Sequence, residues 1–436
     1  MPSDERGVTD GPRTDGPRTD GPSVGHCAQG ASIARFQDGG LAAFRAVVLA
    51  DEALQDRLGA IDRPDAYLAE AMAVARLHGI VLDVEAIRTE IRPDPLGIGR
   101  WMPSPVTLDR WPSRGWSPAR SVQTGGAPAF DWAWFGPGSP TAPFYEDTVR
   151  RFASRPFSQM FRTRTSLDVL VAGSGADPGL DGPAPSGFIH HMSRCGSTLV
   201  AQMLAADPRH VVLSEPEPLD AAIRWAVESG ASIDRQIAAV RAVVAALSRD
   251  RGGEHATRRV FVKLDSWHTA ALPLLRAAFP LTPWVFLYRN PVEILVSQLR
   301  QRGMHTVPGM MSPRILDIPG AETMAPERYT ALVLAHFGRA VLEHWSVGGG
   351  LLVNYDALPG ATMERIAPHF GLVASAAERA AMAAASRRDA KTPDKRFVPD
   401  TASKQEEATP PVQAIVYELL DGVYDTLEIL RRNNKA

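Results

Sequence analysis

The stretch GFIHHMSRCGSTLVAQML, residues Gly187–Leu204, is the part of the sequence that decides the fold. An apolar run leads into a short loop, and the loop leads into a segment of helical spacing. Gly196 lets the backbone approach an anion closely, while Ser197 and Thr198 stand where the helix begins. The free N–H groups and the dipole of that helix would face the same anion. Arg194 adds a forked positive charge, so the stretch predicts an anion-binding turn between a strand and a helix.

This loop differs from the phosphate-binding loop of ATP-dependent enzymes. Their loop ends in Gly-Lys-Ser/Thr, whereas here Gly196 is followed directly by Ser197, and His191 takes the place of the first Gly. The lysine and the hydroxyl that binds magnesium are both missing from their expected register. We therefore expect no metal ion in the reaction.

A second loop of interest lies within FLYRNPVEILVSQLR, residues Phe286–Arg300. An apolar run ends at Arg289, Asn290 is a favourable N-cap, and Pro291 suits the first helical position. Ser297 follows two turns along the same helix face. Arg289 and Ser297 can therefore converge on one ligand group.

Residues 185–436 alternate short apolar runs with helical stretches, which predicts an α/β fold with a P-loop-type parallel sheet flanked by helices. Ligands bind such sheets at the carboxyl ends of the strands. We expect strands near residues 187–191, 211–213, 260–263, 284–289 and 351–355. We expect helices near residues 197–206, 218–247, 267–278, 291–302, 327–346 and 411–431.

The two loops together resemble those of PAPS-dependent sulfotransferases, closest to the tyrosylprotein and bacterial types (PAPS is 3′-phosphoadenosine-5′-phosphosulfate). Their 5′-phosphosulfate loop reads P-[KR]-S-G-[ST]-T-L, and Ser193–Leu199 is similar to it, with Cys195 replacing the usual Ser. Their 3′-phosphate motif reads R-[DN]-P-x-x-x-x-x-S, as Arg289 and Ser297 do here. The resemblance implies PAPS as co-substrate, PAP as product and a sulfotransferase fold. It also implies that the backbone matters most at position 195.

The resemblance also implies catalytic residues. Glu215 lies as far beyond the first loop as the general base of tyrosylprotein sulfotransferases, and Glu217 is the second choice. Lys263 has the spacing from Arg289 of the catalytic lysine, which would neutralise charge on the sulfuryl oxygens. Asp265 stands where cytosolic sulfotransferases carry a catalytic histidine. We expect Asp265 to be either a helper or the cap of the following helix.

The match is looser toward the C-terminus. Tyr355, within NYDAL, is similar to the tyrosine that lies near the adenine in the family. The basic stretch that ends at Lys404 is either a lid over the cofactor or a solvated loop. His190 and His191 are expected to be structural or acceptor-side groups.

Four regions follow from composition along the chain. Residues 1–38 contain the repeat TDGPR and predict a disordered tail. Residues 39–92 predict a small helical module, and LAAFRAVVLADEALQDRLGA with YLAEAMAVARLHGIVLDVEAI resembles Nif11-type domains, which implies docking of a peptide or protein. Residues 93–184 are rich in Pro and Trp and predict an irregular connecting region on the catalytic domain. Residues 185–436 form the predicted sulfotransferase domain.

Details within the connecting region are also predicted. Tryptophans at this density indicate either an anchor onto the neighbouring domain or an aromatic surface that binds the acceptor. A helix is expected from about Glu146 to Ala153, and a strand near Leu167–Val171.

The composition limits the classes of function. The chain has 436 residues, of which 44% are hydrophobic, and a net charge of −2, which signals neither nucleic-acid nor membrane binding. The two cysteines, Cys27 and Cys195, do not make a disulfide framework. A polar N-terminus and the lack of a run of about 18 apolar residues predict a cytoplasmic location.

We therefore expect an enzyme that transfers a sulfuryl group from PAPS to a hydroxyl or amine of a small-molecule or peptide acceptor. Two alternatives stay open at this point. One is a P-loop kinase that uses ATP, and the other is a non-catalytic peptide-binding protein with a degenerate sulfotransferase fold.

Overall fold

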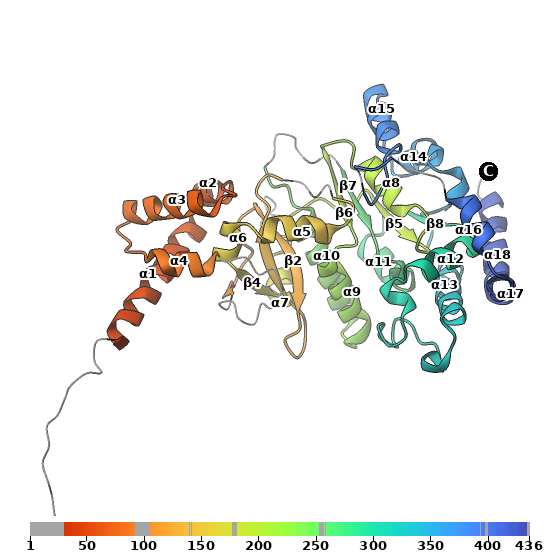
Figure 1. The fold of residues 1–436 in the computed structure, drawn as a ribbon, viewed down its shortest axis with the longest axis horizontal. Helices are drawn as coiled ribbons and strands as arrows, with labels where there is room; N and C mark the ends of the chain where they lie inside the picture. The colour runs from red at the N-terminus through yellow and green to blue at the C-terminus, as the bar shows by residue number, and fades with distance from the viewer. Residues whose placement is uncertain are drawn as a thin grey trace, which may run out of the picture.

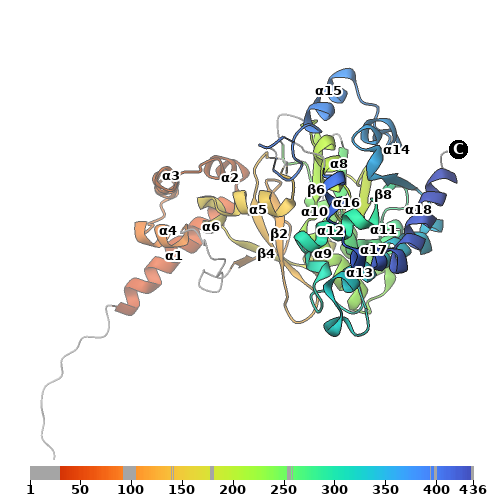
Figure 2. The same ribbon diagram turned by 45° about the vertical axis from the view of Figure 1, so that its right-hand side comes forward.

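The computed structural model describes residues 30–91, 105–138, 140, 142–176, 181–252, 257, 259–392, 394–396 and 400–433, with only the backbone of residues 30–39. Residues 1–29 of the predicted disordered tail lie outside these residues, as does Trp101, whereas residues 30–38, also predicted as tail, lie in helix α1 (Gly30–Ala50). A helical unit, a small sheet and a larger α/β unit follow one another along the longest axis (Figures 1 and 2).

The larger unit is built on a five-stranded sheet formed by the predicted apolar runs. The strands are β5 (Gly187–His191), β6 (His210–Ser214), β7 (Arg259–Lys263), β8 (Trp284–Tyr288) and β9 (Gly350–Asn354). Their order is β6-β7-β5-β8-β9, and every neighbouring pair is parallel. All five strands therefore end at the same edge, as predicted.

Helices cover both faces of this sheet, which explains why its strands are almost continuously apolar. On one face, Ile189 and Val212 pack with residues of α8, whereas Phe188 and Val211 belong to the core on the other face. The helices of this unit are α8 (Ser197–Leu204), α9 (Glu217–Glu228), α10 (Ile233–Ser248), η2 (Ser266–Ala271), α11 (Leu272–Ala278), α12 (Pro291–Arg300), η3 (Met304–Thr306), η4 (Ala321–Thr323), α13 (Pro326–Glu343), η5 (Trp345–Val347), η6 (Tyr355–Ala357), η7 (Thr362–Ile366), α14 (Ala367–His369), α15 (Ala376–Ala385), α16 (Thr401–Glu407), α17 (Pro410–Leu419) and α18 (Asp421–Asn433). The predicted fold class is thereby confirmed.

Two long helices expected from the sequence are each divided. The stretch 218–247 is α9 and α10, because Gly230 between them has a φ of 67° that ends the first helix. The stretch 411–431 is α17 and α18, and the buried Leu420 between them leaves helical geometry with a φ of −121°.

The connecting region is more regular than the sequence suggested. It forms a second sheet of order β1-β4-β3-β2, with β1 (Val106–Thr107), β2 (Trp116–Val122), β3 (Ala129–Trp134) and β4 (Thr163–Ser166). The expected strand near Leu167–Val171 is wrong, since this stretch lies in α7 (Leu167–Gly173). Ser166 decides the outcome, because its hydroxyl accepts from Val169 N at 3.2 Å and caps the helix. The remaining helices of this region are α5 (Tyr145–Ala153) and α6 (Pro156–Met160).

The described tryptophans of this region are buried, so they anchor it and do not form an acceptor surface. They are Trp111, Trp116, Trp132 and Trp134. Arg249, at the end of α10, lies over the rings of Trp111 and Trp132 at 5.6 and 5.9 Å.

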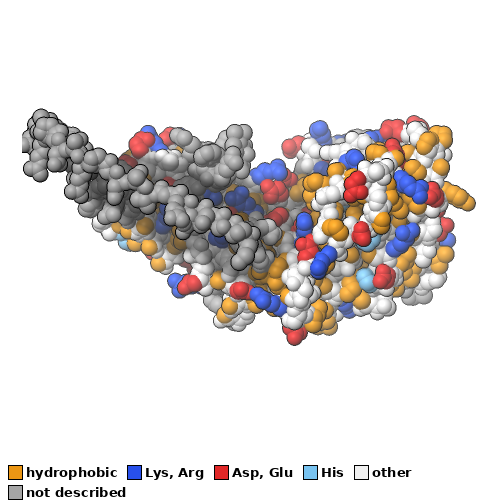
Figure 3. Space-filling view, turned by 90° about the horizontal axis from the view of Figure 1, so that it is seen from below, with side chains coloured by type: hydrophobic (Ala, Val, Ile, Leu, Met, Phe, Trp, Pro, Cys, Tyr) orange, Lys and Arg blue, Asp and Glu red, His pale blue; other side chains and the backbone are white. Residues whose placement is uncertain are grey.

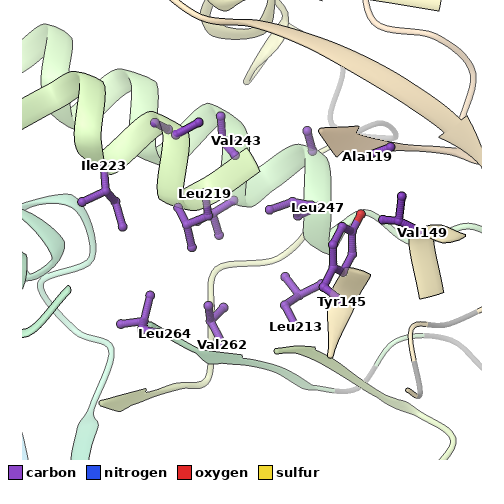
Figure 4. Packing of buried hydrophobic residues seen from close by; sticks show 14 of the residues in the cluster. Ala119, Tyr145, Val149, Leu213, Leu219, Ile223, Val243, Leu247, Val262 and Leu264 are labelled. Carbon is purple, nitrogen blue, oxygen red and sulfur yellow. The ribbon is translucent and has the colours of Figure 1, made fainter. Parts of the chain in front are cut away.

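Figure 4 shows the core that joins this region to the larger unit. Tyr145 of α5 and Ala119 of β2 lie beside Leu219 of α9 and Leu247 of α10, above Leu213 and Val262 of the parallel sheet. The Tyr145 hydroxyl donates to the carbonyl oxygen of Pro118 at 2.6 Å. The two sheets therefore share one hydrophobic core.

The first unit contains α1 (Gly30–Ala50), α2 (Glu52–Gly59), α3 (Pro64–Leu77) and α4 (Val84–Glu90). Asp51 and Asp83 cap α2 and α4 through their carboxylates. Its helices α2, α3 and α4 contact α6, and Gln55 accepts from the Trp116 indole N–H at 2.9 Å. The described helices agree with a small helical module, whose likeness to Nif11-type domains stays a prediction.

On the face seen from below, acidic and basic side chains are interspersed among apolar ones (Figure 3). Within the described residues, none of the helices combines the length and the apolar character needed to cross a bilayer.

Gly59→Ala tests the contact between the helical unit and the small sheet. A Cβ atom at Gly59 would lie 1.9 Å from the indole nitrogen of Trp134, which is itself buried. We expect the free energy of unfolding to fall by about 1–3 kcal/mol, the usual cost of overpacking, as measured by urea denaturation. Gly126→Ala is the control, because a Cβ there meets nothing within 4 Å. Equal stability of the two variants would contradict the packing described here.

Candidate active site

The carboxyl ends of all five parallel strands surround one cavity of about 630 Å³, called here the strand-end cavity. The loop after β5, the first residue after β6, the end of β7, the first residue after β8 and the first residue after β9 all line it. Most of the site residues predicted from the sequence are among its lining residues, namely Arg194, Cys195, Gly196, Ser197, Thr198, Glu215, Lys263, Asp265, Arg289, Ser297, Tyr355 and Lys404. Glu217, the second choice for the general base, does not line this cavity, since its carboxylate accepts from Ser121 of β2.

The backbone around this cavity adopts conformations that L-residues seldom take. Among the described residues, the non-glycine residues with positive φ are Ser193, Arg194 and Glu215, at 69°, 51° and 51°. All three line the strand-end cavity. Each such conformation costs on the order of 1–3 kcal/mol and is typical of functional sites. Backbone of this kind turns successive N–H groups toward one point, where an anion can bind.

The N-terminus of α8 opens into the cavity without a side-chain cap. Its N-cap is Gly196, whose φ of 84° favours glycine. A Cβ atom there would lie 2.7 Å from Leu358 and 3.0 Å from Tyr355, so glycine is also required by space. The first N–H groups of α8 are therefore available to a ligand that carries negative charge.

Cys195 contributes to this loop through its backbone. Its thiol donates to the carbonyl oxygen of Leu287 in β8 at 3.0 Å and is fully buried. Burial raises the pKa of this thiol to about 12. Arg194 is fixed differently, because its guanidinium donates to the carbonyl oxygen of Gln301 at 2.6 Å.

At the β8 end of the cavity, Arg289 is buried within a cage of polar groups. Its guanidinium donates to Asp400 and Thr401, both at 3.0 Å, and pairs with Glu293. It lies 3.9 Å from the centre of the Tyr355 ring. Lys404 reaches the same Asp400 carboxylate at 2.7 Å. The group predicted to bind a phosphate thus already holds a carboxylate.

Ser297 of α12 also lines the cavity and is half-buried. The helix starts where the sequence predicted, with the Asn290 side chain accepting from Val292 N at 3.0 Å. Lys404 belongs to α16. The stretch between α15 and α16 also contributes residues to the lining of the cavity.

Glu215 and Lys263, from neighbouring strands, form an ion pair in the cavity. The Nε2 atom of His191 lies 3.3 Å from the same oxygen of Glu215. Burial alone would raise the pKa of Glu215, but Lys263 and His191 outweigh it and hold the pKa below its ordinary value. Glu215 is therefore ionised at neutral pH and, while paired, is a weak base.

Asp265 has the opposite electrostatics. Burial raises its pKa well above the ordinary value, and the carboxylates of Glu215 and Asp220 raise it further. The cap of the next helix was one of the two alternatives for Asp265. It stands at the N-cap position of η2, but its side chain makes no capping hydrogen bond. Its carboxylate is thus left for the cavity.

The sequence did not single out several other lining residues. Phe144, just before α5, places its ring 5.2 Å from the Lys263 ammonium. Trp267 and His305 face each other with ring centres 5.8 Å apart. Lys391 lies in the basic stretch for which a lid was one of two alternatives, so the sequence did contain a signal for it. Phe144 carried none, because it comes from a distant region of the chain.

Lys391 is a further titratable group of this lining. Burial, with the charges of Arg194 and Lys263, lowers its pKa to about 8. The cavity therefore gathers cations closely enough to perturb one another, which favours a ligand with several negative charges.

Comparison with known proteins gives likenesses of fold alone. No model of a protein family matches the chain, and no curated protein matches it. A sulfotransferase domain from the curacin biosynthetic pathway is 15% identical, with a TM-score of 0.36, over 55% of this chain and 98% of that one. A sulfotransferase of Mycobacterium avium is 16% identical, with a TM-score of 0.37, over 58% and 81%. A sulfotransferase domain of a Synechococcus olefin synthase is 19% identical, with a TM-score of 0.36, over 56% and 95%.

The buried thiol gives a direct test of the first loop. Cys27→Ser leaves Cys195 as the one cysteine of the chain. A thiol with a pKa of about 12 is almost wholly protonated at pH 8 and reacts slowly. We expect Ellman's reagent to modify this variant only after guanidinium is added. One equivalent of rapid reaction in the native protein would contradict the described orientation of the thiol.

Proposed function

We propose that this chain is a sulfotransferase that transfers a sulfuryl group from PAPS to an acceptor hydroxyl or amine. The observation that supports this most is the single cavity at the strand ends. Two predicted anion-binding elements, the loop before α8 and the pair Arg289 and Ser297, both line it. PAPS carries a phosphosulfate on the 5′ position of its ribose and a phosphate on the 3′ position, so it requires two anion-binding elements.

The loop before α8 would hold the 5′-phosphosulfate. Its left-handed residues Ser193, Arg194 and Gly196 form a concave backbone, and the uncapped N-terminus of α8 adds further N–H donors. Arg194 and Lys391 supply positive charge at the same loop. The loop lacks the lysine that ATP-dependent P-loop enzymes use, which disfavours a kinase.

The 3′-phosphate would bind at Arg289 and Ser297, with Lys404 nearby. Arg289 now donates to the Asp400 carboxylate at 3.0 Å, which demonstrates that an anion fits against its guanidinium. A phosphate there would take over these hydrogen bonds from Asp400. Tyr355 stacks on the same guanidinium and would border the nucleoside.

The transfer itself requires a proton acceptor and a cation. The acceptor oxygen would form a bond to sulfur while the bond from sulfur to the 5′-phosphate breaks, and PAP leaves with the electron pair. Lys263 would stabilise the negative charge that develops on the departing phosphate. The acceptor proton would pass to Glu215 or Asp265, which both line the cavity. A positioned base of this kind contributes about 10²–10⁴-fold to the rate.

The electrostatics separate the two carboxylates. Glu215 was the first choice from the sequence, but its pairing with Lys263 lowers its pKa. Burial and the nearby carboxylates raise the pKa of Asp265, so its ionised form binds a proton more strongly than that of Glu215. We therefore propose Asp265 as the proton acceptor and Glu215 as the group that holds Lys263 in place.

Arg289→Ala tests the nucleotide. PAP and adenosine 5′-phosphate differ by the 3′-phosphate, so we expect the variant to lose affinity for PAP far more than for adenosine 5′-phosphate. The loss for PAP should be about 10-fold or more, because a charge-assisted hydrogen bond contributes about 1.5–3 kcal/mol. Isothermal titration calorimetry measures both affinities. An equal loss for the two nucleotides would refute the assignment of the 3′-phosphate.

The pH dependence of PAP binding tests the role of Lys391. Its pKa of about 8 would rise when an anion binds beside it, because the anion stabilises the ammonium. PAP affinity should therefore be level below about pH 8 and decline above it, with uptake of a proton near that pH. Lys391→Arg keeps its charge throughout and should remove the decline. The same decline in wild type and Lys391→Arg would show that another group is responsible.

A further inference from the structure

Behind Asp265 lies a buried histidine that the reaction described above does not use. His268, in η2, is only 2% exposed, and its ring lies between the carboxylates of Asp265 and Asp220. Its Nδ1 atom is 3.9 Å from Asp265 Oδ2, and its Nε2 atom is 2.9 Å from Asp220 Oδ1. The three side chains come from η2, its N-cap and α9.

This row of side chains connects two separate cavities. Asp265 lines the strand-end cavity. Asp220 lines a second cavity of about 790 Å³ between α9 and the β2–β3 hairpin, called here the α9 cavity and lined also by Ser121, Glu217, Arg224 and Glu228. His268 lines neither of them and forms part of the wall between them.

The hydrogen bonds define which nitrogen of His268 carries the proton. Asp220 accepts from the Trp267 indole N–H at 2.7 Å on the same oxygen that faces His268 Nε2. Burial raises the pKa of Asp220, but the interactions with His268, Trp267 and Arg224 together outweigh it and keep the pKa below its ordinary value. An ionised Asp220 accepts only, so Nε2 must donate. In the neutral ring Nδ1 then carries the lone pair, and it has no hydrogen-bond partner among the described residues.

The Nδ1 lone pair of the neutral His268 ring faces the Asp265 carboxylate at 3.9 Å and can accept a proton from that side. A movement of about 1 Å brings Asp265 within hydrogen-bond distance of Nδ1. Once Asp265 carries a proton, it can donate to that nitrogen. Imidazole can accept at one nitrogen and release at the other, which no other side chain does near neutral pH.

We infer that Asp265, His268 and Asp220 form a proton relay from the strand-end cavity to the α9 cavity. This inference rests on the proposed sulfuryl transfer. The acceptor proton passes to Asp265, Asp265 passes a proton to His268 Nδ1, and His268 releases its Nε2 proton to Asp220. Asp220 then loses it to water or buffer in the α9 cavity. His268 and Asp220 are positioning residues, since they act through Asp265.

The charges around the relay favour uptake of the proton at Asp265 and its release from Asp220, while the transfer between the two carboxyl groups runs uphill. The carboxylates of Glu215, Asp220 and Glu217 raise the pKa of Asp265. The ammonium of Lys263 lowers it. At the other end, Arg224 lies 3.7 Å from Asp220 and favours its ionised form. His190 in β5 is a further titratable neighbour, and burial holds it neutral with a pKa of about 3. His190 therefore adds no positive charge that would oppose protonation of His268.

The first experiment examines the ligand-free protein. Nitrogen-15 NMR of the full chain, labelled at histidine, distinguishes the two neutral tautomers, and His268→Gln assigns the signal. We expect His268 to be protonated at Nε2 and unprotonated at Nδ1 at pH 7. The opposite tautomer would overturn the relay, because Nδ1 could not accept from Asp265.

The second experiment measures turnover of PAPS with 2-naphthol as the probe acceptor. Asp220→Ala should lower kcat by about 10²-fold with little change in KM, since it removes proton transfer and not binding. Imidazole or formate in the buffer should restore kcat as its concentration rises, by entering the enlarged α9 cavity. Glu228→Gln, in the same cavity, is the control and should retain wild-type kcat.

The outcomes are distinguishable. A low kcat for Asp220→Ala that no buffer restores would mean that Asp220 has only a structural role, and it would overturn the relay. A normal kcat for Asp220→Ala would overturn it as well. Absence of PAPS turnover in the wild type would overturn the proposed function and the relay together. If the wild type binds PAP and turns over PAPS normally, the proposed function stays intact even when the relay fails.

Discussion

The parallel alignment of five strands is the constraint on which the rest of this structure depends. Because β5 to β9 all run in one direction, their last residues meet at one edge. Each strand end then supplies a different chemical group, such as the loop after β5, Glu215 after β6 and Lys263 at the end of β7. An antiparallel strand in any of these places would have carried its functional residue to the opposite edge.

Some of the basic side chains in the strand-end cavity are paired with carboxylates and others are not, and the unpaired ones indicate where an anion can bind. Lys263 pairs with Glu215, while Arg289 and Lys404 share Asp400. In the described part of the chain, neither Arg194 nor Lys391 has a carboxylate within 4 Å. Both border the loop before α8, so uncompensated positive charge is concentrated where the strained backbone and the free helix N-terminus also lie. Three independent features thus point to the same anion site.

The sequence predicted the parallel sheet and the strand–loop–helix course of the two loops well, because the responsible signals are local. A strand such as β8 is a continuous apolar run, and the loops carry their glycine, proline and charged residues within a few positions of one another. The second sheet was missed because Pro118 and a cluster of tryptophans obscure the alternation of β2 and β3. The stretch after Ser166 has apolar residues that suit either a strand or a helix, and only the cap decides between them.

Contacts between distant residues could not be predicted in the same way. Nothing in the local sequence relates Asp220 to His268, or Phe144 to Lys263. Such pairs arise only when the elements that carry them are packed together. The electrostatic difference between Glu215 and Asp265 has the same origin, because it depends on which charges lie across the fold from each carboxylate.

The carboxylate of Asp400 has a consequence for the thermodynamics of ligand binding. Since Asp400 and Lys404 belong to α16 and its N-cap, a ligand that displaces this carboxylate from Arg289 also alters how the start of α16 is held. Binding at Arg289 is then an exchange of one anion for another, and few counterions are released from the guanidinium. The ionic strength of the solution should therefore influence affinity less than the number of basic side chains in the cavity suggests.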